Sequence, residues 1–288
     1  MTNELTSNLY AAGVTLVLGG SGKTGRRIAE RLQGRGINTR IASRSTKPSF
    51  DWNDQVTWDA VLRDVTAVYI SYAPDLAIPG AADAIRAFVE KAVAQGVRRL
   101  VLLSGRGEAE AQACERIVQA SGVEWTVVRA SWFNQNFSEG EFLGMVQNGE
   151  ITLPAGAISE PFIDANDIAD VAVAALTEEG HDYEVYEVTG PRMLTFTEIA
   201  QEISRAAGRE VKFVQIPKQA FAAAITESGA PDNIAWLLNY LFETVLDGRN
   251  EYLGDGVQRA LGREPTDFAD FAQRIAARGF WDKAEAAA

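Results

Sequence analysis

Short, largely apolar runs alternate with helix-patterned segments through about residue 130. Five runs are predicted strands: Val14–Leu18, Asn38–Ala42, Ala67–Ser71, Arg99–Ser104 and Trp125–Arg129. Between them, apolar residues recur at helical spacing over Gly25–Gln33, Ala81–Gln95 and Glu108–Ala120. Such alternation is typical of right-handed β-α-β units, and it predicts a parallel sheet covered by helices on both faces.

After Phe137 the pattern changes to shorter segments. It predicts a helix over Asp164–Leu176, a strand over Glu184–Val188 and helices from Thr195 onward. We therefore expect an α/β fold with a Rossmann-type doubly wound parallel sheet over residues 1–136, to which the segment of about 161–190 returns. Residues 137–160 and 191–288 would form a smaller C-terminal α+β lobe that binds the substrate.

A glycine-rich turn joins the first predicted strand to the first predicted helix. Glycines at positions 19, 22 and 25 allow a sharp turn, a close approach to a pyrophosphate and packing of the helix on the strand. The free N–H groups at the helix start would face the anion. We expect a dinucleotide to bind at Gly19, Ser21, Gly22, Lys23, Thr24 and Gly25.

The same turn also resembles the end of a nucleoside triphosphate loop, through Gly22-Lys23-Thr24. That loop needs another glycine at position 17, where this chain has Val17 inside the strand. It also needs an Asp for magnesium at the end of a later strand, and the two candidate strands end in Ser71 and Ser104 instead. Both differences favour the dinucleotide.

The residues after the second strand indicate which dinucleotide binds. A site that prefers NAD places an acid there for the ribose 2′-hydroxyl, whereas this chain has Ser43-Arg44-Ser45, followed by Lys47. Guanidinium suits a 2′-phosphate, so we expect NADPH, bound in part by Ser43 and Arg44. The alternative is that Arg44 is an ordinary solvated loop charge. Three residues after the third strand complete the expected cofactor contacts: Ser71, Tyr72 and Ala73.

Composition excludes several other classes of protein. The 288 residues contain 47% hydrophobic residues, one cysteine and one histidine, and carry a net charge of −12. A disulfide framework, a zinc site and a Ser-His-Asp or Cys-His system are therefore not expected, and Cys114 is predicted to be a buried inert thiol. His181, in a charged turn, is predicted to be solvated. We expect no metal.

The charge and the apolar runs also bear on partners and location. Basic residues are scattered through an acidic chain, which argues against nucleic acid as a partner. No run approaches about 18 apolar residues, and Met1–Tyr10 lacks the features of a signal peptide, so we expect a cytoplasmic protein without a membrane partner. The expected partner is a small-molecule substrate, and the oligomeric state stays open.

The chain resembles the NmrA-like group of atypical short-chain dehydrogenases/reductases over about residues 14–275. The matching stretches are VLGGSGKTGRRIAERL, RIASRS, GVRRLVLLSG and VEWTVVRASWFNQNF. It is further similar to ergot-alkaloid-type reductases in FDWND, PFIDANDIADVAVAAL, GPRMLTFTEIAQEIS and GREPTDFADFA. The resemblance implies an NADPH-dependent reductase of quinones, azo dyes, iminium or aldehyde groups, or a redox-responsive regulator that binds the dinucleotide without turnover.

One motif of the wider family is missing. Short-chain dehydrogenases usually protonate the substrate with the Tyr of Tyr-x-x-x-Lys, but none of the seven tyrosines here has Lys four residues on. If Glu115 matches the acid that commonly follows that lysine, Gly107 and Ala111 occupy the Tyr and Lys positions. The chain is then a sensor without chemistry, or its substrate needs little proton donation. An iminium ion is already cationic, and a quinone or azo group can take its proton from water or a nearby hydroxyl. We favour hydride transfer to an activated imine or iminium, quinone, azo or conjugated carbonyl group.

Two residues are candidate catalytic groups. Tyr72 is the nearest candidate proton donor, or else an aromatic wall of the site. Ser104, by the resemblance, occupies a position that often carries a substrate-polarising hydroxyl, and its alternative is a hydrogen bond to its own turn. The predicted substrate pocket lies after the fifth strand of the list above, at Trp132, Phe133, Asn134 and Phe137.

Other residues after that strand have expected roles as well. Asn134 and Asn136 could bind the nicotinamide amide or cap the next helix, and capping is favoured for Asn136. Structural roles are expected for Arg129, Asp164 and Asp167, the two acids preceding or starting a helix. The aromatic residues of a later apolar helical stretch form a pocket lid or, preferably, core: Trp236, Tyr240 and Phe242.

Overall fold

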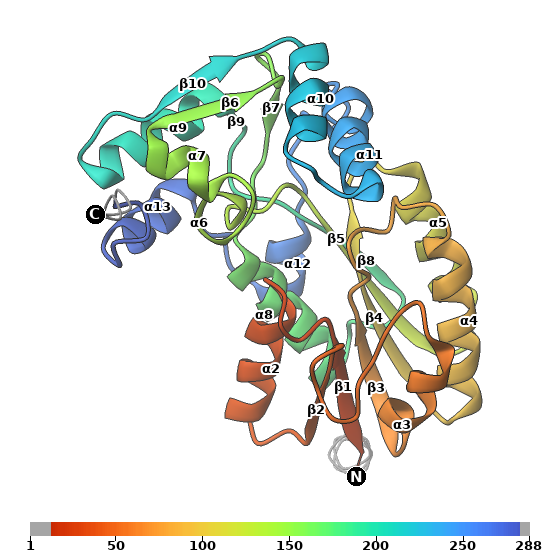
Figure 1. Ribbon diagram of the computed structural model, residues 1–288. Coiled ribbons are helices and arrows are strands. Elements are labelled where there is room, and N and C mark those ends of the chain that lie inside the picture. Colours follow the sequence, from red (N-terminus) through yellow and green to blue (C-terminus); the bar gives the residue numbers. More distant parts are fainter. Residues whose placement is uncertain (1–12, 283–288) are drawn as a thin grey trace. The chain divides into compact units, whose positions relative to one another are not determined.

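The computed structural model describes residues 13–282, so the segment Met1–Tyr10 discussed above lies outside the described residues. Two compact units are present (Figure 1). The first unit contains the described residues up to Ala130, then Ala165–Val188 and Asp255–Arg263. The second unit contains the remaining described residues. The first segment of this unit thus ends at residue 130, where we expected 136, and the unit includes a late segment, Asp255–Arg263, that we had expected in the C-terminal lobe.

The first unit is built on a six-stranded parallel sheet of order β2-β1-β3-β4-β5-β8. The chain passes from β2 on one side of β1 to β3 on its other side, so the strand order reverses at β1 and β3. The strands are β1 (Val14–Leu18), β2 (Thr39–Ala42), β3 (Val65–Ile70), β4 (Arg99–Gly105), β5 (Glu124–Ala130) and β8 (Glu184–Val188). The predicted parallel sheet of Rossmann type is confirmed.

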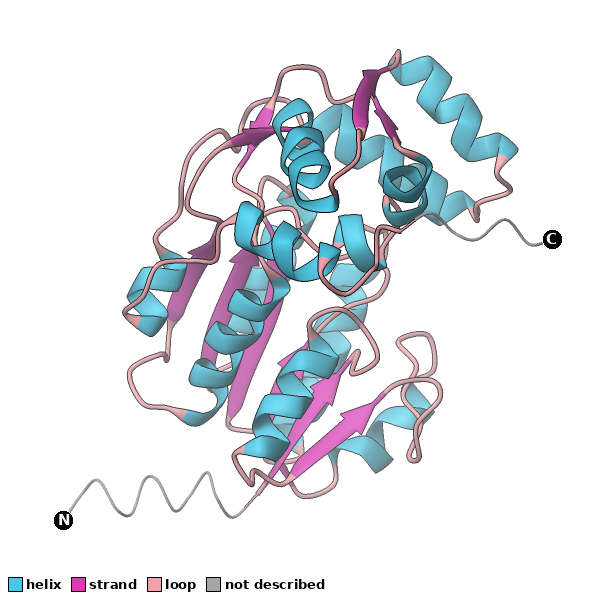
Figure 2. Cartoon of the chain, turned by 90° about the vertical axis from the view of Figure 1, so that its left-hand side faces the viewer, coloured by secondary structure: helices cyan, strands magenta, loops and turns pink. Residues whose placement is uncertain are grey.

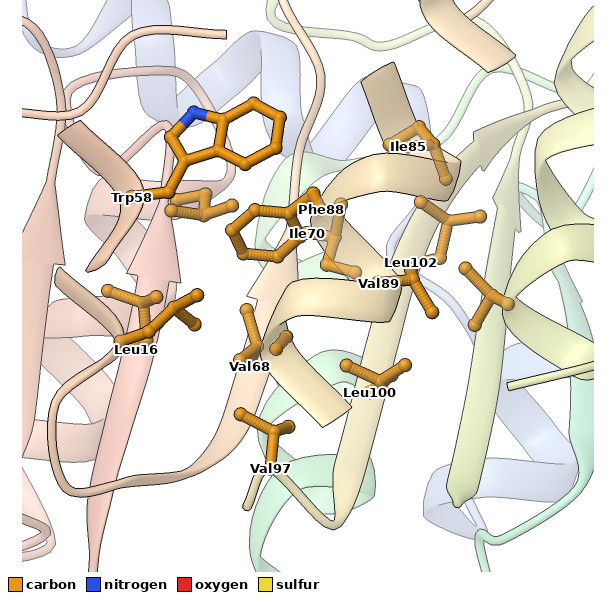
Figure 3. Packing of buried hydrophobic residues seen from close by; sticks show 14 of the residues in the cluster. Leu16, Trp58, Val68, Ile70, Ile85, Phe88, Val89, Val97, Leu100 and Leu102 are labelled. Atoms are coloured by element: carbon orange, nitrogen blue, oxygen red, sulfur yellow. The ribbon is translucent and has the colours of Figure 1, made fainter. Parts of the chain in front are cut away.

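Helices cover both faces of this sheet (Figure 2). Side chains alternate along the strands, so Leu16, Val68 and Leu100 point to one face, where α3 adds Trp58 and α4 adds Phe88 (Figure 3). Helix α5 packs on the same face. The opposite face carries α2, α8 and α12 (Figure 1). The helices are α2 (Gly25–Gly34), α3 (Trp58–Leu62), α4 (Ala81–Ala94), α5 (Ala109–Gln119), α8 (Ala165–Thr177) and α12 (Gly256–Leu261), with a 3₁₀ turn at Gln55–Thr57.

The second unit contains two small two-stranded sheets, β6 with β10 and β7 with β9. Its strands are β6 (Glu150–Leu153), β7 (Ser159–Glu160), β9 (Leu194–Thr195) and β10 (Lys212–Gln215). Its helices are α6 (Asn136–Glu139), α7 (Leu143–Asn148), α9 (Phe196–Ala207), α10 (Lys218–Glu227), α11 (Asp232–Tyr240), a π turn at Leu241–Val245 and α13 (Phe268–Ala276). Aromatic rings dominate its core, with Phe137, Phe162, Phe196, Phe242 and Phe268 at most 1% exposed.

Between residues 13 and 282, none of the helices combines the length and the apolar character that crossing a membrane requires.

Candidate functional site

The glycine turn after β1 holds the start of α2 directly against its own backbone. Gly19 has a φ of +65°, and its carbonyl accepts a hydrogen bond of 2.8 Å from the N–H of Gly22. A Cβ placed on Gly25 would lie 2.3 Å from the Gly19 carbonyl oxygen and 2.9 Å from the Cα of Gly20. Only glycine at position 25 therefore allows the helix to begin this close to the turn.

The start of α2 is suited to an anion. No side chain caps the helix, its first turn contains no acid, and Ser21 and Gly22 in the turn are exposed. The helix start therefore presents backbone N–H groups and the positive end of its dipole without a competing carboxylate. This arrangement fits the pyrophosphate of a dinucleotide.

Thr24 is the one buried hydroxyl-bearing residue of that turn. It is 4% exposed, and its hydroxyl oxygen accepts a hydrogen bond of 2.9 Å from the hydroxyl of Tyr69, on β3. Thr24 is thus held in place by the sheet. The sequence analysis did not anticipate Tyr69, whose apolar surroundings gave no sign of a polar partner.

The loop after β2 leaves two cations unpaired. Its turn is closed internally, since the Ser43 N–H donates to the Thr46 hydroxyl and the Ser43 carbonyl accepts from the Phe50 N–H, both at 2.9 Å. Arg44 and Lys47 are exposed, and neither makes a hydrogen bond or ion pair with any residue in the described part of the chain. A guanidinium held on an ordered turn without a protein partner fits a 2′-phosphate.

The segment after β3 contributes residues beside the glycine turn. β3 ends at Ile70, so Ser71 lies in the loop, and a Cβ on Gly19 would lie 3.3 Å from the Ser71 hydroxyl oxygen. Tyr72 is half-buried, and its ring lies 4.9 Å from that of Trp52 at an angle of 47°. Ser71 and the glycine turn are therefore neighbours, as expected for cofactor contacts, while Ala73 is exposed.

The acidity of Tyr72 changes in the direction opposite to that of a catalytic tyrosine. Burial raises the pKa of its phenol, and the nearby Cys114 thiol raises that pKa further. In short-chain dehydrogenases, which the sequence resembles, a neighbouring lysine lowers the pKa of the proton-donating tyrosine, and Tyr72 has no such lysine four residues on. The aromatic-wall interpretation of Tyr72 is the one that its surroundings favour.

Ser104 belongs to a network of charged side chains at the carboxyl end of β4. Its hydroxyl, 3% exposed, donates a hydrogen bond of 2.6 Å to Glu115 on α5. Arg129 donates to the same carboxylate at 2.9 Å and to Glu187 on β8 at 2.8 Å. The hydroxyl of Ser104 thus donates to Glu115 rather than to its own turn. Arg129 is structural, as predicted.

Two carboxyl groups meet beside this network, and the sequence analysis missed both. Glu108 is the residue before α5 and is 6% exposed, yet its side chain does not cap the helix. A Cβ on Gly105 would lie 2.1 Å from Glu108 Oε1, so the carboxyl group lies over the end of β4. The carboxyl group of Asp75, in the loop after β3, acts on it and raises the pKa of Glu108. Asp75 Oδ1 also accepts a hydrogen bond of 2.8 Å from the N–H of Ala77.

The four predicted pocket residues lie in the second unit. Trp132 is half-buried with its ring 5.2 Å from Phe242, Phe133 forms a bridge to Ile163, and Phe137 is fully buried in the aromatic core. Asn134 is fully buried, and its side-chain oxygen and nitrogen have no hydrogen-bond partner among the described residues. A buried amide without partners is costly, so Asn134 is suited to a polar group of a ligand.

Three further expectations are corrected or refined. Asn136 does not cap the next helix, because it is the first residue of α6 and Gln135 precedes it. His181 is not solvated: it is 8% exposed, with Nδ1 2.9 Å from the hydroxyl of Tyr186, because β8 brings that tyrosine back over the turn. Phe242 is core, whereas Trp236 stacks on Tyr240 and is 41% exposed.

The side chains of Cys114, Asp164 and Asp167, for which structural roles were expected, are buried or bonded within the protein. Cys114 is fully buried, and burial raises the pKa of its thiol to about 11. Asp164 accepts a hydrogen bond of 2.8 Å from Gln135, and Asp167 pairs with Arg263 at 2.7 Å. Within residues 13–282, no group of three or more His, Cys, Asp or Glu side chains could hold a metal ion.

Comparison with known proteins gives matches to two family models and to many relatives. Residues 109–272 match the NmrA-like family, and residues 19–179 match an NAD(P)H-binding family. The chain is 34% identical to agroclavine dehydrogenase of Claviceps fusiformis, covering 89% of this chain and 95% of that protein. It is 30% identical to NAD(P)H azoreductase of Xenophilus azovorans, covering 91% and 98%.

Solved structures share the fold. The NADPH-dependent quinone oxidoreductase of Escherichia coli, solved with NADPH, superposes with a TM-score of 0.77 at 21% identity, covering 91% of this chain and 99% of that one.

Proposed function

Because this chain belongs to the NmrA-like family and matches an NAD(P)H-binding family over residues 19–179, we propose that it is an NADPH-dependent reductase of activated electrophiles. The observation that carries the choice of NADPH is the loop after β2. That loop holds Arg44 and Lys47 exposed and unpaired in the described chain, and no acid lies at the end of β2 to bind a ribose 2′-hydroxyl.

The cofactor would be held by residues of the first unit. The glycine turn and the start of α2 would bind the pyrophosphate, and Arg44 would bind the 2′-phosphate. Ser71, beside Gly19, and Tyr72, against Trp52, would form the next part of the wall. When bound, the dinucleotide supplies the hydride, and the chain contributes position and the exclusion of water.

The substrate class follows from the missing tyrosine and from the relatives. Relatives bear the names agroclavine dehydrogenase and NAD(P)H azoreductase, and a protein of the same fold is a quinone oxidoreductase. We assign to this chain an acceptor with an imine or iminium, quinone, azo or conjugated carbonyl group. Trp132 and Phe133 would line the apolar part of the pocket, and Asn134 would bind the nicotinamide amide with its unpartnered side chain.

The test is oxidation of NADPH and of NADH, followed by absorbance, with a panel of cyclic imines, quinones, azo dyes and conjugated aldehydes. We expect turnover with NADPH, and much weaker turnover with NADH at equal concentration. Tight binding of NADPH without turnover of any acceptor would contradict the proposal. That result would favour the second interpretation, a regulator whose dinucleotide occupancy alters a partner interface.

A further inference from the structure

Glu108 has a buried carboxyl group that is suited to hold a proton. It is 6% exposed, and its Oε2 has no partner among the N–H and O–H groups of the described residues. A carboxylate accepts hydrogen bonds and donates none, and burying its charge without donors is costly, so Glu108 avoids this cost by keeping a proton. Glu108 and Asp75, whose carboxyl group raises the pKa of Glu108, are called the carboxyl pair.

We propose that Glu108 is the proton donor of this reductase and replaces the tyrosine that the chain lacks. The inference rests on the proposed function, because a donor needs a reduction to complete. It also narrows the substrate class to acceptors whose reduction ends with a newly protonated heteroatom, such as azo groups and quinones.

The position of Glu108 supports this role. Glu108 directly follows Gly107, the residue that occupies the tyrosine position when Glu115 is matched to the family pattern. Its carboxyl group lies over Gly105, the last residue of β4, in a space that any other residue at position 105 would fill. Doubly wound sheets bind their ligands at this carboxyl edge. The alternative donor hydroxyl nearby, on Ser104, is already bonded to Glu115.

The electrostatics of the pair agree with a protonated Glu108 near neutral pH. Burial raises the pKa of Glu108 well above its usual value, and the charges that act on it most strongly, those of Asp75, Glu110 and Glu115, raise that pKa further. Burial also raises the pKa of Asp75. Paired carboxyl groups with raised pKa values are a known way of keeping a general acid protonated at neutral pH.

The reaction step balances with one proton and one hydride. The hydride adds to one nitrogen of an azo group, the electron pair of the N=N π bond moves to the other nitrogen, and that nitrogen takes the proton of Glu108. The azo compound is reduced to the hydrazine, and NADPH is oxidised to NADP⁺. Glu108 is left as a carboxylate beside Asp75, and it recovers a proton from solvent before the next turnover.

The experiment compares Glu108→Gln with wild type, with NADPH and an azo dye or quinone as acceptor, over pH 5.5–9. General acids contribute roughly 10²- to 10⁴-fold to rate, so we expect kcat to fall by about that factor in the variant. We also expect the wild-type kcat to decline at alkaline pH and the variant to lose this decline. The NADPH dissociation constant should be unchanged. Glu90→Gln changes an exposed acid of α4 that is not among the charges acting on Glu108, so it is the matched control and should keep both kcat and its pH profile.

Asp75→Asn provides a second variant. Asparagine keeps an oxygen for the Ala77 N–H and can donate to Glu108 from its amide, which removes a like charge and favours the Glu108 carboxylate. We therefore expect the alkaline decline of kcat to move to lower pH. An unchanged profile in both Glu108→Gln and Asp75→Asn, with turnover intact, would overturn the inference and leave the proposed function standing. If the wild-type protein fails to oxidise NADPH with every acceptor of the panel, the proposed function is overturned, and this inference with it.

The proton on Glu108 can also be detected without turnover. The usual carboxyl pKa of Glu108 is 4.5, and its folded pKa is raised. The folded protein therefore holds a proton that the unfolded chain releases, so stability declines as pH rises from 4.5 through the folded pKa. The Gln of Glu108→Gln has no proton to lose, so the urea midpoint of the variant should rise relative to that of wild type between pH 5 and pH 9. A constant difference between the two midpoints would contradict a protonated Glu108.

Discussion

The hydroxyl of Tyr69 donates a buried hydrogen bond of 2.9 Å to the hydroxyl of Thr24, which links the third strand of the parallel sheet to the residue before α2. Val17 of β1 lies opposite Tyr69 in the sheet register, so the bond reaches across the strand that leads into the glycine turn. The sheet interior therefore holds the end of the turn that we assign to the pyrophosphate.

Tyr69→Phe should destabilise the fold and weaken the cofactor site together. Removing the donor leaves the buried Thr24 hydroxyl without its partner, which costs about 1–3 kcal/mol. We expect a drop of that size in the free energy of urea unfolding and a several-fold rise in the NADPH dissociation constant. A double-mutant cycle with Thr24→Val isolates the pair, and additive single and double effects would show that the bond contributes nothing.

Gly25→Ala should disrupt the glycine turn. The same change at the other end of α2, Gly34→Ala, should stabilise the protein. The added methyl group at position 25 would lie 2.3 Å from the Gly19 oxygen, and relieving such a contact costs about 1–3 kcal/mol or more. Gly34, the last residue of α2, has no atom within 4 Å of an added Cβ, so Gly34→Ala should gain about 0.4–1 kcal/mol. Thermal unfolding and NADPH titration of the two variants measure both effects. If the two variants have the same stability and the same NADPH affinity, the close approach of α2 to the Gly19 backbone is contradicted.

Arg44→Ala should weaken the binding of NADPH and leave the binding of NADH unchanged. Hydrogen bonds to charged groups contribute about 1.5–3 kcal/mol, which corresponds to a ten- to hundredfold rise in the NADPH dissociation constant. NADH lacks the 2′-phosphate, so its affinity should not change. Arg63→Ala is the matched control, because Arg63 is equally exposed but precedes β3 at the opposite edge of the sheet. Fluorescence titration gives both dissociation constants. If the affinities for NADPH and NADH fall equally, Arg44 acts through its general positive charge and does not bind the 2′-phosphate.

His181 should make stability depend on pH below neutrality. Burial lowers its pKa from the usual 6.5, so the unfolded chain binds the proton first as pH falls. Its contribution to stability is then fully present above pH 6.5 and is lost as pH falls through the folded pKa. His181→Gln does not titrate, so the difference in unfolding free energy between wild type and variant should shrink from pH 7.5 to pH 5. Parallel stability curves would show that folding leaves the pKa of His181 unchanged, which would contradict this prediction.

The sheet and the glycine turn could be predicted because their signals are local. Most strands of the first unit are short, largely apolar runs, and the five expected from the first half of the sequence lie within two residues of their observed limits. The turn depends on three glycines within seven residues, and the bulk that would clash at Gly25 is the backbone of Gly19 in the same segment. The exposed Arg44 likewise follows directly from its place after β2.

The carboxyl pair and the buried histidine depend on contacts that sequence spacing does not contain. Asp75 and Glu108 meet because β3 and β4 are neighbours in the sheet, so that the loops after them start at the same edge. His181 lies in a turn of charged residues, and only the return of β8 places Tyr186 against it. Neither contact can be predicted until the order of the strands in the sheet is known.

The first unit is assembled from three separate stretches of sequence, the last of which ends at Arg263. A growing chain has therefore passed through most of the second unit before α12 is made, and through residues 131–164 of that unit before β8 can complete the sheet. Until then β5 presents an open edge with unpaired backbone groups, which is a template for pairing with another chain. During synthesis the edge of β5 thus stays open until β8 has been made. Slow translation between residues 130 and 184 would prolong the interval in which nascent chains can associate.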